Sequence, residues 1–144
     1  FERGTAFMAQ QLRFAKEFAN VKALAQGKGV ADDPEIRQRL ARSYGELEIM
    51  RWLGLRNVTP FIKGGQPGPE GSIGKLFWSK WHQRLGELEA DLLGADALIM
   101  HDEGSLEHDF QHTFLFSRAH TIYAGSTEIQ RNIVGERVLG LPRE

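Results

Sequence analysis

The fold of this chain is organised around the stretch Ile122-Tyr123-Ala124-Gly125-Ser126-Thr127-Glu128-Ile129-Gln130-Arg131-Asn132-Ile133-Val134. Gly125 suits a tight turn, because glycine adopts backbone angles that are closed to other residues. Ser126 is then a predicted N-cap, and Glu128 stands in the first turn, where a carboxylate favours the positive end of the helix dipole. Apolar residues follow at helical spacing and predict one apolar stripe: Ile129, Ile133, Val134 and Val138. The stretch predicts a capped helix from 126 to about 139, and a turn at a helix N-terminus suits an anion or a hydroxyl-rich ligand.

Three longer upstream segments also have helical periodicity. Residues 2 to 26 predict a first helix that Gly27 and Gly29 interrupt. Asp32 or Asp33 is expected to cap the second helix, with Pro34 at its first position and an end near 58. A loop rich in glycine and proline precedes the third helix, which is predicted from 70 to 94 and has the strongest periodicity. The expected inward-facing residues are Phe7, Phe14, Phe18, Val21, Ala25, Ile36, Leu40, Leu47, Met50, Ile73, Phe77, Trp81, Leu85, Leu88 and Leu92.

The remaining segment, 95 to 113, is mixed in character, and a short helical piece is predicted over 114 to 120. No strand-like alternation and no internal repeat interrupts the helical pattern. Long helices joined by short loops pack as antiparallel neighbours. The predicted fold is therefore all-α, an antiparallel four-helix bundle over residues 1–144.

Composition narrows the classes of function. The chain has 144 residues, of which 41% are hydrophobic, enough for one core. Its net charge is −1, and Lys and Arg are dispersed among Asp and Glu, which argues against a nucleic-acid partner. There are no cysteines, hence no thiolate chemistry. No apolar run approaches the ~18 residues of a membrane span, so we expect a soluble, cytoplasmic protein that does not bind a membrane.

The string from Tyr123 to Arg131, followed by 135–140, resembles the C-terminal signature of the flavin-dependent acyl-CoA dehydrogenases. In that family the turn lies over the flavin of a neighbouring subunit. The segment 74–79, Gly-Lys-Leu-Phe-Trp-Ser, is similar to the family's Ala-Lys-Leu-Phe-x-Ser helix, and 1–4 is similar to the start of the first C-terminal-domain helix. The resemblance implies a C-terminal bundle domain of a longer, actinobacterial-type flavoprotein, and therefore FAD as cofactor.

One departure from the family bears on catalysis. Position 124 is Ala, where many members carry the glutamate that removes the substrate proton. In the branch that includes the isovaleryl and long-chain types, the base is instead a glutamate in a Leu-Glu-Arg-like string. Because Phe1-Glu2-Arg3-Gly4 matches that string, the resemblance implies Glu2 as the catalytic base. A glutamate at a helix start is otherwise an ordinary dipole partner.

The resemblance also assigns flavin-binding positions. At the turn these are Gly125, Ser126 and Glu128, and Gly94 is the residue retained from the family's Gln-Ile-x-Gly-Gly segment, aligned with 91–95. Asp91 in that segment would repel a diphosphate unless another group screened it. The family's Arg-x-x-Phe-Gly segment has no clear counterpart in 27–32, where Lys28, or Arg37 further on, is a candidate replacement cation.

The implied reaction is α,β-dehydrogenation of an acyl-CoA to the trans-2-enoyl-CoA, within fatty acid metabolism and lipid degradation. An electron-transfer flavoprotein is the expected acceptor, and a homo-oligomer or a heteromer with a paralogous subunit is the expected assembly. The isolated fragment is expected to be inactive. A flavin-deficient structural or partner subunit of a heteromeric enzyme is the alternative, with tryptophans serving as core or interface anchors.

The histidines offer one further alternative. His108 and His112 are four residues apart, a spacing that allows two metal ligands on one helical face, although no Glu follows His108 as in zinc-protease helices. A helical metal-binding domain is therefore a minor alternative, and no metal is predicted. His82 and His120 indicate no particular site.

Overall fold

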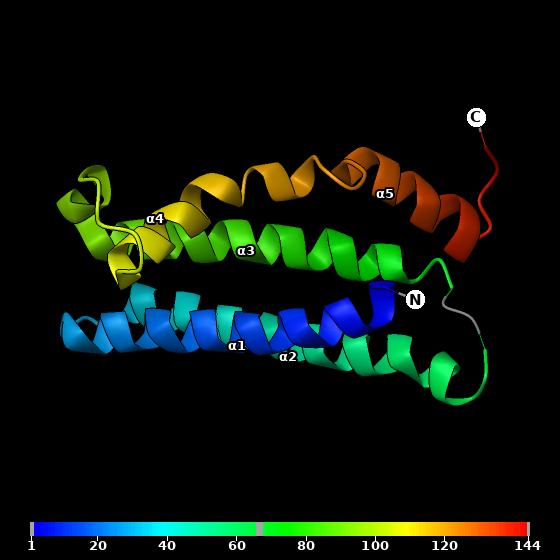
Figure 1. The fold of residues 1–144 in the computed structure, drawn as a ribbon, viewed down its shortest axis with the longest axis horizontal. Coiled ribbons are helices and arrows are strands. Elements are labelled where there is room, and N and C mark those ends of the chain that lie inside the picture. Colours follow the sequence, from blue (N-terminus) through cyan, green and yellow to red (C-terminus); the bar gives the residue numbers. More distant parts are fainter. Residues whose placement is uncertain (1, 66–67, 144) are drawn as a thin grey trace.

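The computed structural model describes residues 2–65 and 68–143, and their side chains except those of 2–9 and 61. Three long helices run antiparallel along the long axis of the molecule (Figure 1): α1 Glu2–Gly27, α2 Pro34–Ile62 and α3 Gly71–Leu93. The fourth position is shared by two shorter helices, α4 Leu106–Phe116 and α5 Thr127–Ile133. The structure has no strand within the described ranges. The predicted all-α antiparallel bundle is confirmed, with its fourth rod broken in two.

Short turns connect and extend these helices. They are η1 Gly94–Leu98 and η2 Ala119–Thr121, both 3₁₀ turns, and the π-helical turn η3 Val134–Val138. Figure 1 shows α4, η2 and α5 as one interrupted rod beside α3. The interruption at η2 leaves an irregular backbone in the middle of this rod, ahead of α5.

The start of α2 follows its predicted capping signal, whereas its end does not. Asp33 is the cap of α2, since its Oδ1 accepts from the backbone N–H groups of Glu35 and Ile36 at 2.9 and 3.1 Å. The expected end of this helix near 58 is wrong, because α2 continues to Ile62. Pro60 lies close to the helix end, where its missing N–H removes only one bond, and Thr59 Oγ1 donates to the Leu55 carbonyl at 2.8 Å.

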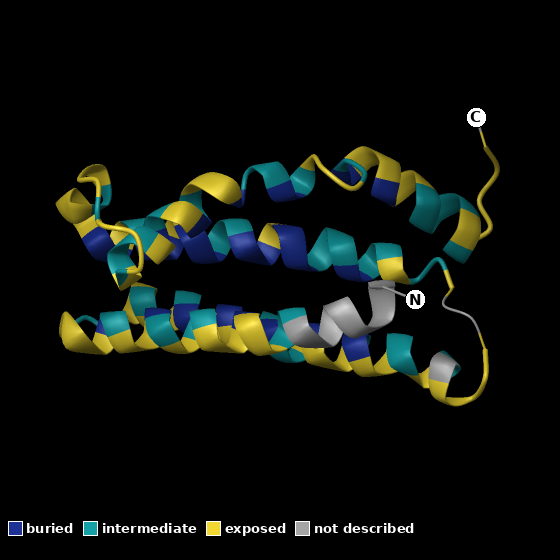
Figure 2. Ribbon diagram, viewed as in Figure 1, coloured by how far each residue is buried: buried dark blue, intermediate teal, exposed yellow. Residues whose placement is uncertain are grey.

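The core lies along α3, which packs against every other α-helix. Trp81 is fully buried beside Phe14, with ring centroids 4.9 Å apart, and its Nε1 donates to the backbone and hydroxyl oxygens of Ser43 at 3.0 Å. The dark-blue residues in Figure 2 follow α3 and the inner faces of its neighbours. The predicted inner residues of α1 to α3 are buried or partly buried, apart from Phe7, whose side chain lies outside the described part.

The segment before the final turn differs from its prediction. A helix covers Leu106–Phe116, so the predicted piece over 114–120 is helical only in part: residues 114–116 end α4, and a 3₁₀ turn follows at 119–121. Ser105 caps α4, because its Oγ accepts from the His108 N–H at 3.1 Å. Gly86 lets α3 and α4 come close, since a Cβ there would lie 2.8 Å from the Phe114 Cα. The polar residues of α4 hide its apolar periodicity in the sequence, although Ser105 could have been recognised as an N-cap.

The predicted apolar stripe of α5 is also wrong in one position. Ile129 is 53% exposed, whereas Thr127 and Gln130 are buried. Gln130 faces inward because its Nε2 donates to the Ala124 carbonyl at 2.9 Å. After Ile133 the backbone widens into η3, so the regular spacing of 3.6 residues no longer holds. The predicted helical range of 126–139 is otherwise met by α5 and η3 together.

Candidate functional site

The turn at 122–126 carries two consecutive residues in the left-handed region. Ala124 has φ 55° and Gly125 has φ 95°. Glycine adopts this conformation freely, whereas a residue with a Cβ pays about 1 kcal/mol or more. A Cβ at Gly125 would also lie 2.5 Å from Gln130 Nε2, the group that holds the turn. The backbone here is therefore a fixed, sharp bend that requires glycine at 125.

The bend leads directly into the capped start of α5. Ser126 is the N-cap, and its Oγ accepts from the Ile129 N–H at 3.5 Å, as predicted. Glu128 is exposed, and hydrogen bonds from its own backbone N–H and from the Ser126 hydroxyl lower the pKa of its carboxyl. Tyr123 and Ile122 are also exposed on this side. The turn thus presents a hydroxyl, a carboxylate and two large side chains to its surroundings.

The other predicted site residues lie elsewhere. Gly94 follows the last residue of α3, with φ 65°, at the end of the bundle opposite to the start of that helix (Figure 1). The backbone of Glu2 opens α1, at the same end of the bundle as α5, and its side chain lies outside the described part. The structure therefore brings Gly125, Ser126 and Glu128 together but places Gly94 in a separate group.

That separate group gathers the two segments that depart most from the family pattern. Lys28 Nζ donates to the Leu93 carbonyl at 3.2 Å, which joins the loop after α1 to the end of α3. Arg39 NH1 lies 2.7 Å from Asp91 Oδ2, so the aspartate is paired with a cation. Arg39 therefore offsets the negative charge of Asp91, which was expected to repel a diphosphate. Lys28 contacts the residue that precedes Gly94.

Sequence reasoning missed a buried polar chain that crosses the bundle. His82 of α3 is 2% exposed, and its Nδ1 lies 2.9 Å from Nδ1 of His120 in η2. On the other side of the ring, His82 Nε2 lies 3.0 Å from Glu17 Oε2 of α1. Although burial raises it, the pKa of Glu17 is lowered overall by His82 and Arg13. Only the three-dimensional packing aligns these groups, because 65 positions separate Glu17 from His82, and 38 separate His82 from His120.

A second buried acid lies near this chain. Glu89 is 1% exposed, and neither of its carboxyl oxygens has a hydrogen-bond partner among the described residues. Burial, and then the charges of Glu17 and Asp109, raise the pKa of Glu89 to about 9. Burial, followed by the charges of His82 and Arg13, lowers the pKa of His120 to about 4. Near neutral pH both groups are therefore uncharged.

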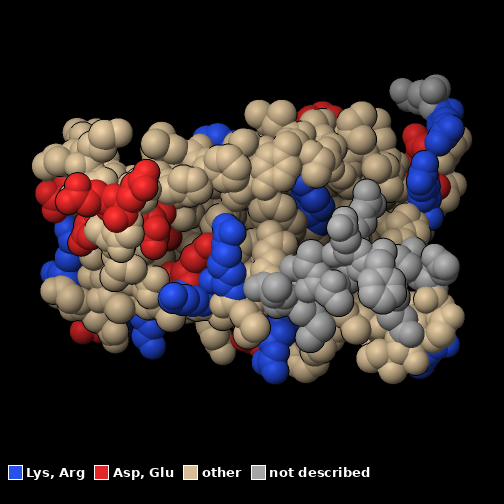
Figure 3. All heavy atoms as spheres, in the orientation of Figure 1, with Lys and Arg blue, Asp and Glu red and all other residues tan. Residues whose placement is uncertain are grey.

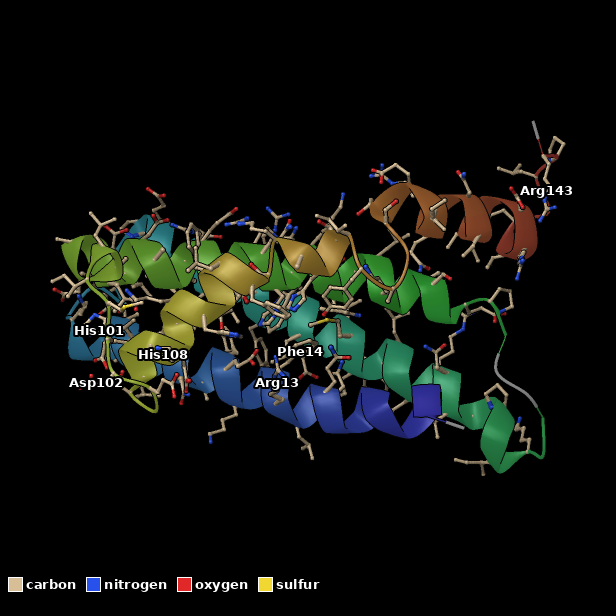
Figure 4. The ribbon with its side chains drawn as sticks, turned by 45° about the horizontal axis from the view of Figure 1, so that its top comes forward. Arg13, Phe14, His101, Asp102, His108 and Arg143 are labelled. Atoms are coloured by element: carbon tan, nitrogen blue, oxygen red, sulfur yellow. The ribbon has the colours of Figure 1, made fainter. Side chains whose placement is uncertain are left out.

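These groups surround a pocket of about 300 Å³ between α1, α3 and α4. Its lining includes Glu17, His82, Glu89, Asp109 and His120. Figure 4 labels two residues of the α1 side, Arg13 at the pocket and Phe14 in the core beside it. The mixed lining of acids, bases and imidazoles suits water molecules and proton exchange better than an apolar ligand.

The histidines proposed as metal ligands have other contacts. His108 Nδ1 lies 3.3 Å from the His101 carbonyl, and these residues lie with Asp102 at one end of the molecule (Figure 4). His112 stacks on Phe116, with ring centroids 5.2 Å apart. In the part of the chain that the structure describes, no group of three or more His, Asp or Glu residues is arranged to hold a metal ion. The metal-binding alternative therefore lacks a third ligand there.

One group of acidic residues stands out on the face of the molecule that Figure 3 shows. Figure 3 shows acidic side chains gathered at the end of the molecule that carries η1 and the start of α4, where Asp96, Asp102 and Glu103 are exposed. Trp52 on α2 is 64% exposed, whereas Trp78 and Trp81 are buried, so two of the three tryptophans are core residues. Among the helices described, none combines the length and the apolar character needed to cross a lipid bilayer.

Comparison with known proteins agrees with this geometry. Residues 3–139 match the family described as "Acyl-CoA dehydrogenase, C-terminal domain". The acyl-CoA dehydrogenase IpdE1 of Mycolicibacterium smegmatis is 46% identical over 144 residues, and that of Mycobacterium tuberculosis is 46% identical over 145. Both alignments cover 100% of this chain but only 35% and 36% of the relatives. The chain therefore spans about a third of the length of the curated relatives it matches.

Solved structures give the same fold. The structure described as "Tcur3481-Tcur3483 steroid ACAD" superposes with a TM-score of 0.82 at 25% identity, covering 96% of this chain and 36% of that one. The ChsE4-ChsE5 complex from Mycobacterium tuberculosis superposes with a TM-score of 0.75 at 22% identity, covering 91% and 36% of the two chains.

The fold and the sequence match together define an all-helical domain of the acyl-CoA dehydrogenase type. The chain belongs to the acyl-CoA dehydrogenase family, of which it carries the C-terminal domain, and its relatives indicate a member of actinobacterial type.

Proposed function

We propose that this chain is the C-terminal domain of an FAD-dependent acyl-CoA dehydrogenase that converts an acyl-CoA to the trans-2-enoyl-CoA. The observation that carries the proposal is the sharp bend at Ala124 and Gly125, leading into the Ser126-capped start of α5. That bend occurs within the segment that resembles the family's flavin-contacting turn. The whole enzyme would include residues beyond this chain, and the domain by itself is expected to be inactive.

The residues present fit a flavin dinucleotide. Gly125 permits the sharp bend, and the Ser126 hydroxyl and Glu128 carboxylate beside it would offer polar contacts. At the other end of the bundle, the pairing of Asp91 with Arg39 and the presence of Lys28 beside Gly94 make a diphosphate acceptable. When bound, FAD supplies the acceptor for the β-hydride of the substrate.

Glu2 is the proposed base. A carboxylate that removes the α-proton must lie within hydrogen-bond reach of the α-carbon, and its carboxyl then holds that proton. Ala124 has only a methyl group, so it cannot perform this step. The start of α1, which carries Glu2, lies at the same end of the bundle as α5 (Figure 1), which supports this assignment.

The substitution Glu2→Gln in the full-length enzyme tests this proposal. Glutamine keeps the size of the side chain but cannot accept the proton. We expect flavin to remain bound and the rate of flavin reduction by acyl-CoA to fall by about 10² to 10⁴. The matched control is Glu35→Gln, which changes an exposed glutamate in the first turn of α2 and should leave the rate unchanged. Unchanged turnover in Glu2→Gln would exclude Glu2 as the base.

A second candidate function is a flavin-deficient partner subunit in a heteromeric enzyme. Two observations favour it. The family's Arg-x-x-Phe-Gly segment is absent from 27–32, and the matching solved structures are described by two components each. The absorption spectrum of the full-length protein distinguishes the two functions. Flavin absorbance in the protein purified without a partner favours the enzyme, and its appearance only in a two-subunit complex favours the partner role.

The remaining assignments belong to the same proposal. The substrate would be an acyl-CoA, and an electron-transfer flavoprotein would accept the electrons. Assembly would be a homo-oligomer, or a heteromer with a paralogous subunit, and the enzyme would act in the cytoplasm. Exposed side chains along the broken rod, such as Leu115, Ile122 and Ile129, offer apolar area for such contacts.

A further inference from the structure

The buried chain of Glu17, His82 and His120 connects three separate elements of the bundle. Glu17 lies on α1, His82 on α3 and His120 in η2. His120 precedes the first residue of the turn at 122–126 by two positions. The contacts are 3.0 Å from Glu17 Oε2 to His82 Nε2, and 2.9 Å between the two Nδ1 atoms. Both histidines are at least 97% buried, so the row of Glu17, His82 and His120 lies in the interior of the bundle.

The distances restrict where protons can lie. Two ring nitrogens 2.9 Å apart attract each other only if one of them carries a proton and the other accepts it. The Glu17 carboxylate oxygen lies 3.0 Å from His82 Nε2, within ion-pair distance, although the two atoms do not meet the geometry of a hydrogen bond. His82 therefore has the Glu17 carboxylate on its Nε2 side and a hydrogen bond with His120 at Nδ1. A change to either partner alters the hydrogen bonding of both rings.

The residues that directly precede the turn, His120 and Thr121, are held by several contacts with α3 and with neighbouring aromatic rings. The His120 ring packs edge-on against Tyr123 and Phe116, with centroids 5.5 and 5.2 Å away. The His120 carbonyl accepts from Lys75 Nζ, and the Thr121 hydroxyl accepts from Gln83 Nε2 at 3.3 Å. Residues 120 and 121 are therefore attached to α3 by three polar contacts.

Apolar packing cannot supply this attachment. Ile122 is 68% exposed and Tyr123 is 43% exposed, so the turn itself buries little apolar surface in this chain. Ala124 also holds a left-handed backbone that is unfavourable for a residue with a Cβ. Gln130 holds the bend from within α5, and the contacts with α3 add to it. Loss of the contacts with α3 would therefore lower the population of the flavin-facing geometry.

We propose that Glu17, His82 and His120 are positioning residues that hold the turn at 122–126 in its bent form through the hydrogen bond between the two imidazole rings. The proposal rests on the proposed function insofar as the turn contacts flavin. None of the three is a catalytic residue, since they act through the turn.

Two substitutions of His120 in the full-length protein separate hydrogen bonding from packing. His120→Asn keeps a group that can donate or accept at the position of Nδ1 but loses the ring. His120→Phe keeps the aromatic contacts with Tyr123 and Phe116 but has no nitrogen. Amide hydrogen exchange over 121–128 reports on the turn directly, with or without flavin, and exchange in α2 reports on the rest of the bundle.

We expect exchange over 121–128 to be about tenfold faster in His120→Phe, corresponding to one lost buried hydrogen bond, and close to wild type in His120→Asn. Flavin affinity should fall in His120→Phe by about the factor by which the bent form is depopulated. Leu92→Ala is the control, because it removes core packing far from η2. It should accelerate amide exchange in α2 without selectively affecting exchange in the turn.

Equal exchange in the two His120 variants, or a selective effect on the turn in Leu92→Ala, would overturn the proposal. If His120→Phe does not fold, Glu17→Met against Glu17→Gln gives the same comparison, because only glutamine retains an acceptor for His82. A protein that binds no flavin yet shows the predicted exchange pattern would refute the proposed function and keep the positioning role. Normal flavin binding with unchanged amide exchange in His120→Phe would refute the positioning role and leave the proposed function standing.

Discussion

The two sides of this bundle are stabilised in different ways. On the side of α1, α2 and α3, long uninterrupted helices bury Phe14, Met50 and Trp81 completely. On the side of α4, η2 and α5, the rod is broken, and the polar contacts of His120, Thr121 and Gln130 fix its backbone. The regular side therefore holds most of the buried apolar core, whereas the irregular side carries the segment that resembles the family's C-terminal signature.

The largest effect should come from the regular side. Trp81→Ala removes a fully buried ring and its hydrogen bonds to Ser43. We expect a loss of about 3–5 kcal/mol in the free energy of unfolding, measured by urea denaturation of the chain. Trp52→Ala, at a 64% exposed tryptophan, is the control and should cost under about 1 kcal/mol. Similar losses for both would mean that α3 is not the centre of the core.

The buried acid between the two sides should give the next effect. Because its pKa is raised to about 9, Glu89 in the folded state keeps a proton that the unfolded chain releases near pH 4.5. Its contribution to stability is complete below pH 4.5 and is lost as the pH rises towards 9. Glu89→Gln stays neutral, so its stability relative to wild type should increase by about 4 kcal/mol between pH 5 and 8. A difference that does not change with pH would show that Glu89 is ionised in the fold.

The contact between the two sides is tested at Gly86. A methyl group there would lie 2.8 Å from the Phe114 Cα, which is backbone and cannot rotate away. Gly86→Ala should therefore push α4 from α3 and cost about 2 kcal/mol, despite the better helix propensity of alanine. Gly45→Ala on α2, where nothing lies within 4 Å, is the control and should be neutral or slightly stabilising. Stabilisation by Gly86→Ala would contradict the close approach of the helices.

The smallest effect should be confined to the irregular side. Ser126→Ala removes the N-cap of α5 and should cost about 1 kcal/mol of local stability, seen as faster amide exchange over 127–133. Ser105→Ala removes the N-cap of α4 in the same way and should instead accelerate amide exchange over 106–116. Only Ser126→Ala should weaken flavin binding in the full-length enzyme. Equal weakening by both variants would mean that the turn has no special role.

The regular side was predictable from the sequence, because apolar residues at helical spacing determined α1, α2 and α3 and their inner faces. Ser126 was also found, and Asp33 was one of two candidate caps beside Asp32, since capping depends on neighbouring residues alone. The irregular side was not fully predictable: the polar sequence of α4 hid its period, and Gln130 rather than Ile129 faces inward. The pairing of His82 with His120 could not be predicted, because no local pattern indicates which distant side chains meet in a core.

The proposed function depends most on a contact between flavin and the turn at 122–126 with the first residues of α5, and one measurement addresses that contact directly. Amide hydrogen exchange of the full-length protein would be compared in its flavin-free form and after addition of FAD. We predict that FAD slows exchange over 122–128 by about tenfold or more while α2 is unaffected. Bound flavin together with unchanged exchange over 122–128 would contradict the account.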